Sequence, residues 1–274
     1  MKLKELLPDC SASVSEVEIT GITCNSLKVK KGYAFVCIVG TVQDGHKYAA
    51  SALENGAAVI IAQRDLGIEN QVVVEDTRTV YSEICAKWFG NPADSLKLVG
   101  VTGTNGKTTT TALLGKIMGD ARESVFVVGN IGTAYTSKSL EMREDSVTVA
   151  EISSFQLETI EQFRPKVSAI LNITEDHLNR HHTMEEYIRV KELITKNQGP
   201  EDVCVLNYED EVLRKFGENI VPKVVYFSSL RKLDQGIYLD GDQIILKTEK
   251  EEIPIVKTGE LKILGRHNHE NVMA

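Results

Sequence analysis

A glycine-rich segment followed by a lysine and threonines is the strongest chemical signal in the sequence. Residues 96–102 are mostly apolar, residues 103–106 read Gly-Thr-Asn-Gly, and Lys107 and Thr108 precede an apolar helical pattern over residues 112–118. The backbone N–H groups of such a loop, together with the N-terminus of a helix, bind phosphate oxygens. The lysine reaches the outer phosphates, and the threonine hydroxyl is placed for Mg²⁺. The segment therefore predicts a strand, a phosphate-binding loop and a helix.

The spacing of this loop departs at one position from the common G-x-x-x-x-G-K-[ST] pattern. That pattern would place glycine at position 101, where this chain has Val101, with Gly100 and Gly103 on either side. The alternative is a chance glycine-rich turn before a helix. We favour phosphate binding because the strand, Lys107, Thr108 and the helix all follow the expected order.

Polar residues also follow three later segments that are expected to form strands, at residues 124–128, 146–150 and 167–171. These segments end in residues 129–132 (Gly-Asn-Ile-Gly), in Glu151 and in Asn172. Ligands bind at the carboxyl ends of the strands in open parallel sheets. We therefore expect these groups to converge on the loop around Lys107.

Glu151 is a candidate Mg²⁺ ligand, because an acid at the end of a buried strand can coordinate the ion beside a nucleotide phosphate. The alternative is an acid that favours the start of a helix, since Ser153 is placed to cap a helix through Gln156 and Leu157. We favour the metal role because a phosphate loop is present. For His177, in the loop after another strand, two interpretations stay open: a ligand or proton donor, and a loop histidine that caps a helix.

Lys191 lies within a segment, residues 184–197, that is expected to be helical. On its own a lysine in such a helix is a surface residue. A lysine that is partly removed from water instead has a lowered pKa and reacts as the free amine. With CO₂ it would form a carbamate, which binds metal as a carboxylate does, but the spacing does not show this. We expect the nearby His181 and His182 to be mostly solvated.

The composition indicates an ordinary folded protein. The chain has 274 residues, 42% hydrophobic and 26% charged, and a formal net charge of −8, which disfavours nucleic acid and anionic membranes as partners. The five cysteines show no metal-binding spacing, so we expect reduced, mostly buried thiols and a cytoplasmic location. The N-terminus has too short an apolar stretch for a signal peptide, and no run approaches the length of a membrane span.

The order of apolar segments predicts an α/β protein with two domains, residues 1–92 and 93–274, separated near the Asn91-Pro92 turn. The first is expected to be a small α/β domain with strands at residues 17–22, 33–39, 57–62 and 72–74 and helices at residues 48–55 and 77–89. The second alternates strand and helix, which predicts a parallel sheet covered by helices. It continues with a strand at residues 203–206 and a hairpin at residues 236–247 turning on Asp240-Gly241. Residues 265–274 read as the start of a helix, so we expect a truncated chain.

Residues 102–109 resemble the nucleotide loop of the Mur ligases, the ATP-dependent enzymes that add amino acids to UDP-N-acetylmuramoyl precursors of peptidoglycan. The second domain resembles the D-glutamate-adding ligase in five places: residues 129–132, 151–158, 174–177, Lys191 and residues 265–268. Residues 1–95 instead resemble the tripeptide-forming ligase, which adds diaminopimelate or lysine, in residues 22–26, 35–36 and 41–46. That ligase usually has Asp-Ser-Arg where this chain has Asn25-Ser26-Leu27. The chain therefore looks like a hybrid joined at the phosphate loop.

The resemblance implies a role for each matching residue. ATP would be held by Gly103, Thr104, Asn105, Gly106, Lys107, Thr108 and Thr109, with Asn268 and Asn271 at the adenine. Two Mg²⁺ ions would be bound, the first by Thr108 and Glu151 and the second by His177 and a carbamylated Lys191. The UDP-muramoyl substrate would contact Ser26, Thr41, Val42, Gln43, Asn130 and Ser153. Lys107, His177 and Lys191 would be the catalytic residues.

The implied fold is a small UDP-binding α/β domain followed by a central P-loop-type ATPase domain with a parallel sheet and a small β-hairpin region. The family's third, C-terminal domain is expected to be missing, and we expect a monomer. The leading hypothesis is ATP-dependent, ADP-forming addition of D-glutamate to UDP-N-acetylmuramoyl-L-alanine. Three alternatives remain: tripeptide formation, a nucleotide-binding module without turnover, and folylpolyglutamate synthesis, against which the match at residues 22–46 weighs.

Overall fold

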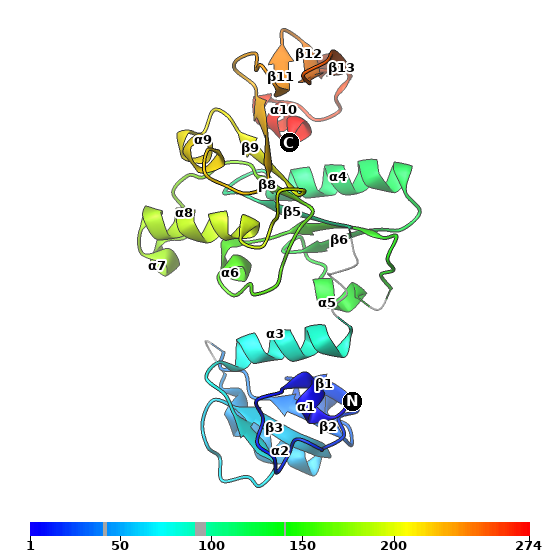
Figure 1. Cartoon of the computed structure of the whole chain (residues 1–274), viewed down its shortest axis with the longest axis vertical. Coiled ribbons are helices and arrows are strands. Elements are labelled where there is room, and N and C mark those ends of the chain that lie inside the picture. Colours follow the sequence, from blue (N-terminus) through cyan, green and yellow to red (C-terminus); the bar gives the residue numbers. More distant parts are fainter. Residues whose placement is uncertain (41–42, 91–96, 140) are drawn as a thin grey trace. The chain divides into compact units, whose positions relative to one another are not determined.

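The computed structural model describes residues 1–40, 43–90, 97–139 and 141–274. The chain divides into two compact units, Met1–Pro92 and Ala93–Ala274, which are described one at a time (Figure 1). Two residues expected at the uridine site, Thr41 and Val42, lie outside the described residues, as does the Asn91-Pro92 turn.

Unit 1 contains a four-stranded parallel sheet in the order β1-β2-β3-β4. Its strands are β1 (Gly21–Thr23), β2 (Tyr33–Val36), β3 (Ala57–Ala62) and β4 (Gln71–Val73). Its helices are α1 (Leu3–Leu6), α2 (Ala49–Glu54) and α3 (Thr77–Trp88), with 3₁₀ turns η1 (Ser26–Lys28) and η2 (Gly45–Tyr48). The predicted α/β arrangement of this segment is confirmed.

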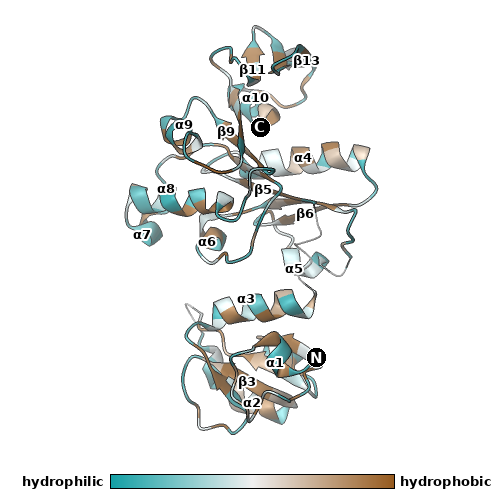
Figure 2. Cartoon of the chain, in the orientation of Figure 1, coloured by the Kyte–Doolittle hydropathy of each residue, from teal (hydrophilic) through white to brown (hydrophobic). Residues whose placement is uncertain are grey.

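Helix α3 begins where Asp76 accepts hydrogen bonds from the backbone N–H groups of Arg78 and Thr79, as expected of an N-cap. In Figure 2 it carries both hydrophobic and hydrophilic residues, and Ile84 on its apolar face joins the core. The strand expected at residues 17–22 is shorter than predicted. Val17 and Ile19 instead form backbone hydrogen bonds with Leu3 and Met1, so that stretch holds the N-terminus.

Unit 2 contains a nine-stranded sheet in the order β13-β12-β11-β10-β9-β8-β5-β7-β6. All pairs from β6 to β11 are parallel, and β11, β12 and β13 pair antiparallel. The strands are β5 (Lys97–Thr102), β6 (Val125–Gly129), β7 (Val147–Glu151), β8 (Val167–Ile170), β9 (Val203–Asn207), β10 (Lys223–Ser228), β11 (Gly236–Asp240), β12 (Gln243–Lys247) and β13 (Glu252–Lys257). The predicted hairpin turns at Asp240-Gly241, where Gly241 has a φ of 61°.

Strand β5 lies between β7 and β8, although β6 is the next strand in the chain. The chain therefore leaves β5 in one direction and later returns to its other side. In parallel sheets this change of direction opens a crevice at the carboxyl ends of the strands. The phosphate loop follows β5 directly and so lies at this crevice.

Helices cover both faces of this sheet (Figure 1). They are α4 (Lys107–Ala121), α5 (Tyr135–Lys138), α6 (Ser154–Leu157), α7 (Leu178–His181), α8 (Met184–Glu192), α9 (Glu211–Gly217) and α10 (Arg266–Met273), with 3₁₀ turns η4 (Leu193–Thr195) and η5 (Thr258–Glu260). One apolar cluster joins Leu98 and Ile170 to α8, and a second joins Val101 and Ala169 to α10. Alternate residues of each strand thus face opposite layers. The predicted parallel sheet covered by helices is confirmed.

The helix expected over residues 184–197 is shorter than predicted. Helix α8 ends at Glu192 and a 3₁₀ turn follows. Beyond it, the side-chain amides of Asn197 and Gln198 donate to the backbone oxygens of Phe163 and Pro165, at 3.0 and 2.9 Å. Side-chain amides compete for backbone groups in this way and favour the end of a helix.

The cysteines are all free, as expected, but they are less buried than expected. Cys37 and Cys204 are buried, Cys10 and Cys85 are partly buried, and Cys24 is exposed. Burial raises the pKa of the Cys37 and Cys204 thiols to about 12. Within the described part of the chain, we find no helix with the length and apolar character needed to span a membrane.

Candidate nucleotide and metal site

The loop between β5 and α4 has the backbone of a phosphate-binding loop. Gly103 and Gly106 have φ values of 145° and 83°, which residues with side chains rarely adopt. Gly106 also occupies the N-cap position of α4. A Cβ atom at Gly106 would collide with Oδ1 of Asn271. Glycine is therefore required here both for the turn and for the close approach of α10.

Neighbouring loops hold this loop in place. The Asn105 N–H donates to Oδ1 of Asn172 at 2.8 Å, and Nδ2 of Asn172 donates back to the Asn105 oxygen at 3.1 Å. Oγ1 of Thr104 accepts from the N–H of Thr174 at 3.0 Å. Nζ of Lys107 donates to the Thr104 oxygen at 2.9 Å. Contacts with the protein's own groups thus fix the loop, and Lys107 folds back over it.

Glu151 ends β7 as a buried carboxylate that is only 1% exposed. Its Oε2 accepts from Oγ1 of Thr108 at 2.9 Å, and its Oε1 accepts from Nδ2 of Asn130 at 2.9 Å. The predicted convergence of Asn130, Glu151 and Asn172 on the loop is therefore confirmed. Both donors to Glu151 are neutral. In the described part of the chain, no Lys, Arg or His side chain forms an ion pair with it. A buried carboxylate without a cation is costly, so this site fits a divalent cation.

Ser153 caps a helix, as one interpretation of the sequence predicted. Its Oγ accepts from the Gln156 N–H, and the Gln156 side chain accepts from the Ser153 N–H, which is a capping box at the start of α6. The carboxylate of Glu151 is not used for this cap, since it faces Thr108 and Asn130. The helix cap is therefore formed by Ser153, and the carboxylate of Glu151 remains a candidate Mg²⁺ ligand.

Lys191 is buried, with 2% exposure, and is not the surface lysine that its position alone suggested. Its Nζ donates to the Gly103 oxygen at 2.8 Å and lies 4.7 Å from the centre of the Tyr187 ring. Burial lowers its pKa to about 7, repulsion by Lys107 adds to this, and Asp176 opposes it. A large share of Lys191 is therefore a free amine at neutral pH, as carbamate formation requires.

His177 occupies the N-cap position of α7 with a φ of 53° and a ψ of 26°, and its side chain makes no capping hydrogen bond. Its Nε2 lies 3.3 Å from Oδ2 of Asp176, and its ring packs against Phe155 with centroids 4.9 Å apart. About half of the side chain, 48%, is exposed. The imidazole is therefore accessible to a ligand. Asp176, which also opposes the lowering of the Lys191 pKa, is thus the acidic neighbour of the His177 ring.

The residues that the structure describes contain no group of three or more His, Cys, Asp and Glu side chains arranged around a metal. Each implied pair of Mg²⁺ ligands contains one residue of these four types. Glu151 is paired with a threonine, and His177 is paired with a lysine. The donors that do fit are the Glu151 carboxylate and the Thr108 hydroxyl, which are hard oxygen ligands.

The expectation that His181 is solvated is wrong. It is 3% exposed, and its Nε2 lies 3.0 Å from Oγ of Ser154. Burial lowers its pKa, which favours the neutral ring. His182 is exposed, as expected.

A pocket of about 330 Å³ lies beside the loop. It is lined by Asn105, Gly106, Leu171, Asn172, Phe227, His267, Glu270 and Asn271. Oδ1 of Asn271 accepts from Oγ1 of Thr110 at 3.3 Å, and its Nδ2 donates to Oδ1 of Asn268 at 3.1 Å. Both amides expected at adenine are therefore held in fixed orientations next to the phosphate loop. Sequence reasoning missed Phe227, the second-to-last residue of strand β10, although a position near the carboxyl end of an apolar run was a usable signal.

In unit 1, the described residues expected at the uridine site follow neighbouring parallel strands. Ser26 begins η1 after β1, where Oδ1 of Asn25 accepts from the Leu27 N–H. Gln43 comes after β2, and its backbone oxygen accepts from the Gly40 N–H at 2.8 Å. Because β1 and β2 are parallel neighbours, both residues lie toward the same edge of the sheet.

A phosphate loop at the crevice of a parallel sheet, with a buried acid and a base-sized pocket beside it, defines a nucleotide-binding α/β protein. Family models agree with this class: "Mur ligase middle domain" matches residues 101–274, and "Mur ligase family, catalytic domain" matches residues 18–93. The chain belongs to the Mur ligase family.

Among curated relatives, the UDP-N-acetylmuramoylalanine–D-glutamate ligase of Lachnoclostridium phytofermentans is 57% identical over 178 residues, 65% of this chain and 39% of the relative. The same ligase of Clostridioides difficile is 49% identical over 192 residues, 70% of this chain and 42% of the relative. The chain thus spans about two fifths of the length of these relatives.

Solved structures share the fold. A UDP-N-acetylmuramoyl-L-alanyl-D-glutamate–2,6-diaminopimelate ligase superposes with a TM-score of 0.79 at 22% identity, covering 100% of this chain and 62% of that one. The MurF ligase of Thermotoga maritima, in complex with ADP, superposes with a TM-score of 0.63 at 22% identity, covering 94% of this chain and 61% of that one.

Replacing Gly106 with alanine is expected to weaken ADP binding by roughly tenfold or more, because the added methyl group both strains the φ of 83° and displaces Asn271. Isothermal titration calorimetry with ADP would measure this loss. Gly119→Ala in α4 is the matched control, since a Cβ there meets open space. Equal ADP affinity in the two variants would contradict the assigned loop geometry.

Proposed function

We propose that this chain provides the UDP-precursor and ATP sites of an ADP-forming ligase that adds D-glutamate to UDP-N-acetylmuramoyl-L-alanine. The observation that carries the proposal is the buried Glu151 carboxylate, which joins Thr108 of the phosphate loop to Asn130. The choice of D-glutamate is supported by the names and the 57% and 49% identities of the curated relatives.

The proposed chemistry follows from the weakness of a carboxylate as an electrophile. Transfer of the γ-phosphoryl group of ATP to the acceptor carboxylate forms an acyl phosphate and releases ADP. The amine of the amino acid then attacks the acyl carbon, and phosphate leaves. Lys107 and the loop N–H groups would stabilise the charge that develops on the transferred phosphoryl group, which is the main task in phosphoryl transfer.

Mg²⁺, when bound, would neutralise charge on the phosphate oxygens and on the acyl group. Thr108 and Glu151 would hold the first ion, and His177 with a carbamylated Lys191 would hold the second. The chemistry of the donors supports the first site, because a buried carboxylate and a hydroxyl are hard oxygen ligands. The lowered pKa of Lys191, about 7, supports the modification.

The two units would divide the substrates between them. In the proposal, residues 93–274 bind ATP and present Asn130 and Ser153 to the muramoyl group, while Asn268 and Asn271 contact adenine. Residues 1–92 bind the uridine end through Ser26 and Gln43, together with Thr41 and Val42. A cytoplasmic location belongs to the proposal, and the five free cysteines support it.

A product assay tests the proposal. The chain is supplied with ATP, Mg²⁺ and either UDP-N-acetylmuramoyl-L-alanine with D-glutamate or the corresponding dipeptide precursor with diaminopimelate or lysine. Phosphate release and product mass are measured, and calorimetry with ADP is run in parallel. Product from the first pair only supports the proposal. Product from the second pair would assign tripeptide formation, and ADP binding without release would assign a nucleotide-binding module.

The Lys191 carbamate is expected to depend on pH. Carbamate forms on the free amine, so it should be abundant above the Lys191 pKa of about 7 and be lost as the pH falls through that value. Carbon-13 NMR with labelled bicarbonate would measure the carbamate signal at about pH 6 and about pH 8. An ordinary lysine, with a pKa of roughly 10.4, would stay almost wholly protonated at both pH values. Lys191→Arg, which cannot form a carbamate, is the control. A carbamate signal that persists in this variant would place the modification elsewhere.

A further inference from the structure

Two very short helices carry residues of the proposed site. Helix α6 and helix α7 have four residues each. Ser153 is the N-cap of α6, and His177 is the N-cap of α7. Helices of this length are not stable on their own, so contacts with the rest of the protein must fix their positions.

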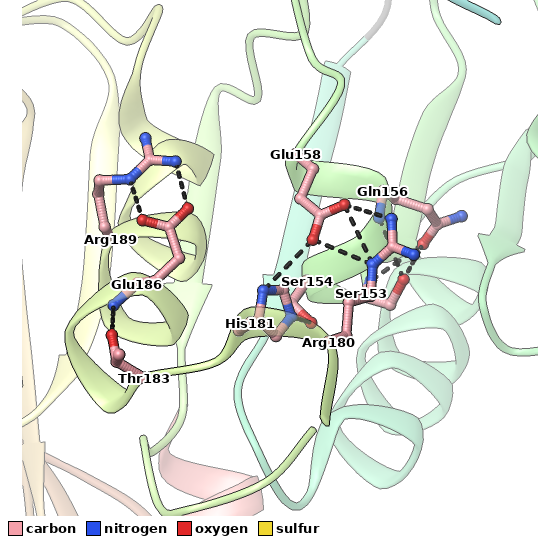
Figure 3. Close-up of polar contacts among 9 residues, drawn as sticks. All are labelled: Ser153, Ser154, Gln156, Glu158, Arg180, His181, Thr183, Glu186 and Arg189. Atoms are coloured by element: carbon pink, nitrogen blue, oxygen red, sulfur yellow. Dashed lines mark hydrogen bonds and ion pairs between the residues drawn. The ribbon is translucent and has the colours of Figure 1, made fainter. Parts of the chain in front are cut away.

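Polar contacts of the buried His181 side chain join the two helices. Nε2 of His181 lies 3.0 Å from Oγ of Ser154, and Nδ1 lies 3.3 Å from Oε1 of Glu158 (Figure 3). The His181 ring thus faces the Ser154 hydroxyl through one nitrogen and the Glu158 carboxylate through the other. This order of serine, histidine and acid resembles that of hydrolases. However, Ser154 is 2% exposed, so it cannot reach a substrate.

A second set of contacts runs from Glu158 to His177. Arg180 donates through Nε to Oε1 of Glu158 at 3.1 Å and through a terminal nitrogen to Oε2 at 2.5 Å (Figure 3). The Arg180 guanidinium lies 4.8 Å from the centre of the Phe155 ring. Phe155 in turn packs against the ring of His177. Glu158 is therefore linked to His177 through Arg180 and Phe155.

The backbone explains why His177 needs such support. His177 and His182, at the two ends of α7, are the non-glycine residues of the described chain with positive φ, at 53° and 67°. Such conformations persist only where surrounding contacts determine them, and they gather at functional sites. Between them, Arg180 and His181 attach α7 to α6.

We propose that Ser154, Glu158, Arg180 and His181 form a positioning network that sets the place of His177, and with it the second cation site, relative to Ser153. The inference rests on the proposed function for the roles of His177 and Ser153. His181 is a positioning residue, because it acts through Phe155 and His177 and does not touch the phosphate loop. Outer contacts of this kind tune how tightly a ligand residue holds its metal.

Four substitutions separate the parts of the network. His181→Ala removes both contacts of the ring. His181→Asn keeps a donor where Nδ1 meets Glu158, and His181→Gln keeps an amide where Nε2 meets Ser154. Glu158→Gln keeps the shape but removes the charge that binds Arg180. Arg189→Ala is the control, because it breaks an exposed ion pair with Glu186 inside α8, which Figure 3 shows beside the network.

NMR of the histidine side chains in the ADP-bound chain provides the readout. The Phe155 ring shifts the His177 ring signals, and added Mn²⁺ broadens them when the ion binds nearby. In His181→Ala and Glu158→Gln we expect the Phe155-induced shift to decrease and roughly tenfold more Mn²⁺ to be needed for the same broadening. The affinity for ADP should stay unchanged. His181→Asn should restore more of both signals than His181→Ala.

The outcomes separate this inference from the proposed function. Unchanged His177 shifts and Mn²⁺ response in His181→Ala, His181→Gln and Glu158→Gln would overturn the network. Near-ultraviolet circular dichroism shows whether His181→Ala folds. If it does not, His181→Asn and His181→Gln test the network in its place. If the unsubstituted chain binds no ADP, the proposed ATP site is wrong, and if Mn²⁺ does not broaden the His177 signals, the proposed second cation site is wrong. The Phe155-induced shift of His177 still tests the positioning network after either outcome.

Discussion

Lys107→Ala is expected to lower ATP-dependent phosphate release by on the order of 100-fold or more, as loss of a donor to a developing negative charge does. Lys107 is the cation of the loop, and its Nζ lies 2.9 Å from the Thr104 oxygen, over the position where the phosphates would bind. ADP affinity should fall as well, because the same ammonium attracts the bound phosphates.

Lys116→Ala is the matched control for this substitution. Lys116 lies in the same helix α4, is 72% exposed and pairs with Asp120. Removing it takes away the same charge without touching the loop, so phosphate release and ADP binding should stay close to those of the unsubstituted chain. Normal turnover by Lys107→Ala would refute the assignment of the ATP site.

Glu151→Gln is expected to remove the dependence of nucleotide binding and turnover on Mg²⁺, and to lower the rate by on the order of 100-fold. The amide keeps the size of the side chain, but it lacks the charge that holds a divalent cation. Thermal unfolding should occur at the same or a higher temperature, because a buried charge without a cation is replaced by a neutral group. Calorimetry of ADP with and without Mg²⁺, together with a melting curve, measures both effects.

Glu211→Gln is the control, since Glu211 in α9 is 69% exposed and lies in a surface pair with Lys215. It should leave the Mg²⁺ dependence unchanged. A Glu151→Gln variant that loses both Mg²⁺ dependence and folding would point to a structural role. One that keeps full Mg²⁺ dependence would remove Glu151 from the cation site.

The convergence of the site could be predicted because it follows from a rule about sheets. Lys107, Asn130, Glu151 and Asn172 all stand at or just beyond the carboxyl end of an apolar run, and parallel strands bring such ends to one edge. No knowledge of side-chain packing is needed for that step. The same reasoning gave β3 its observed bounds, because residues 57–62 form a short apolar run closed by polar residues.

The burial of Lys191 had a signal in the sequence that was not used. Tyr187, Lys191 and Ile194 are spaced four and three residues apart, which places the lysine on the apolar stripe of the helix. All three are buried. His181 offered no such signal. Its partners Ser154 and Glu158 lie 27 and 23 residues earlier in the sequence, and only the packing of α7 on α6 brings them together.

The pocket residues show the same limit. Asn105 belongs to the loop, Phe227 lies near the end of β10, and Glu270 lies in α10, so three distant segments form one wall. The resemblance to a family indicated Asn268 and Asn271. It did not indicate Phe227 or Glu270, which depend on where β10 lies in the sheet.

Each oxygen of Glu151 accepts from a different segment, Oε2 from Thr108 at the start of α4 and Oε1 from Asn130 after β6. One carboxylate thus connects the phosphate loop to the loop that follows the neighbouring strand. The three side chains therefore form one mechanical unit, so a change at any of them should alter the surroundings of the other two. The effects of Thr108→Ala and Asn130→Ala on thermal unfolding are accordingly expected not to add when the two substitutions are combined.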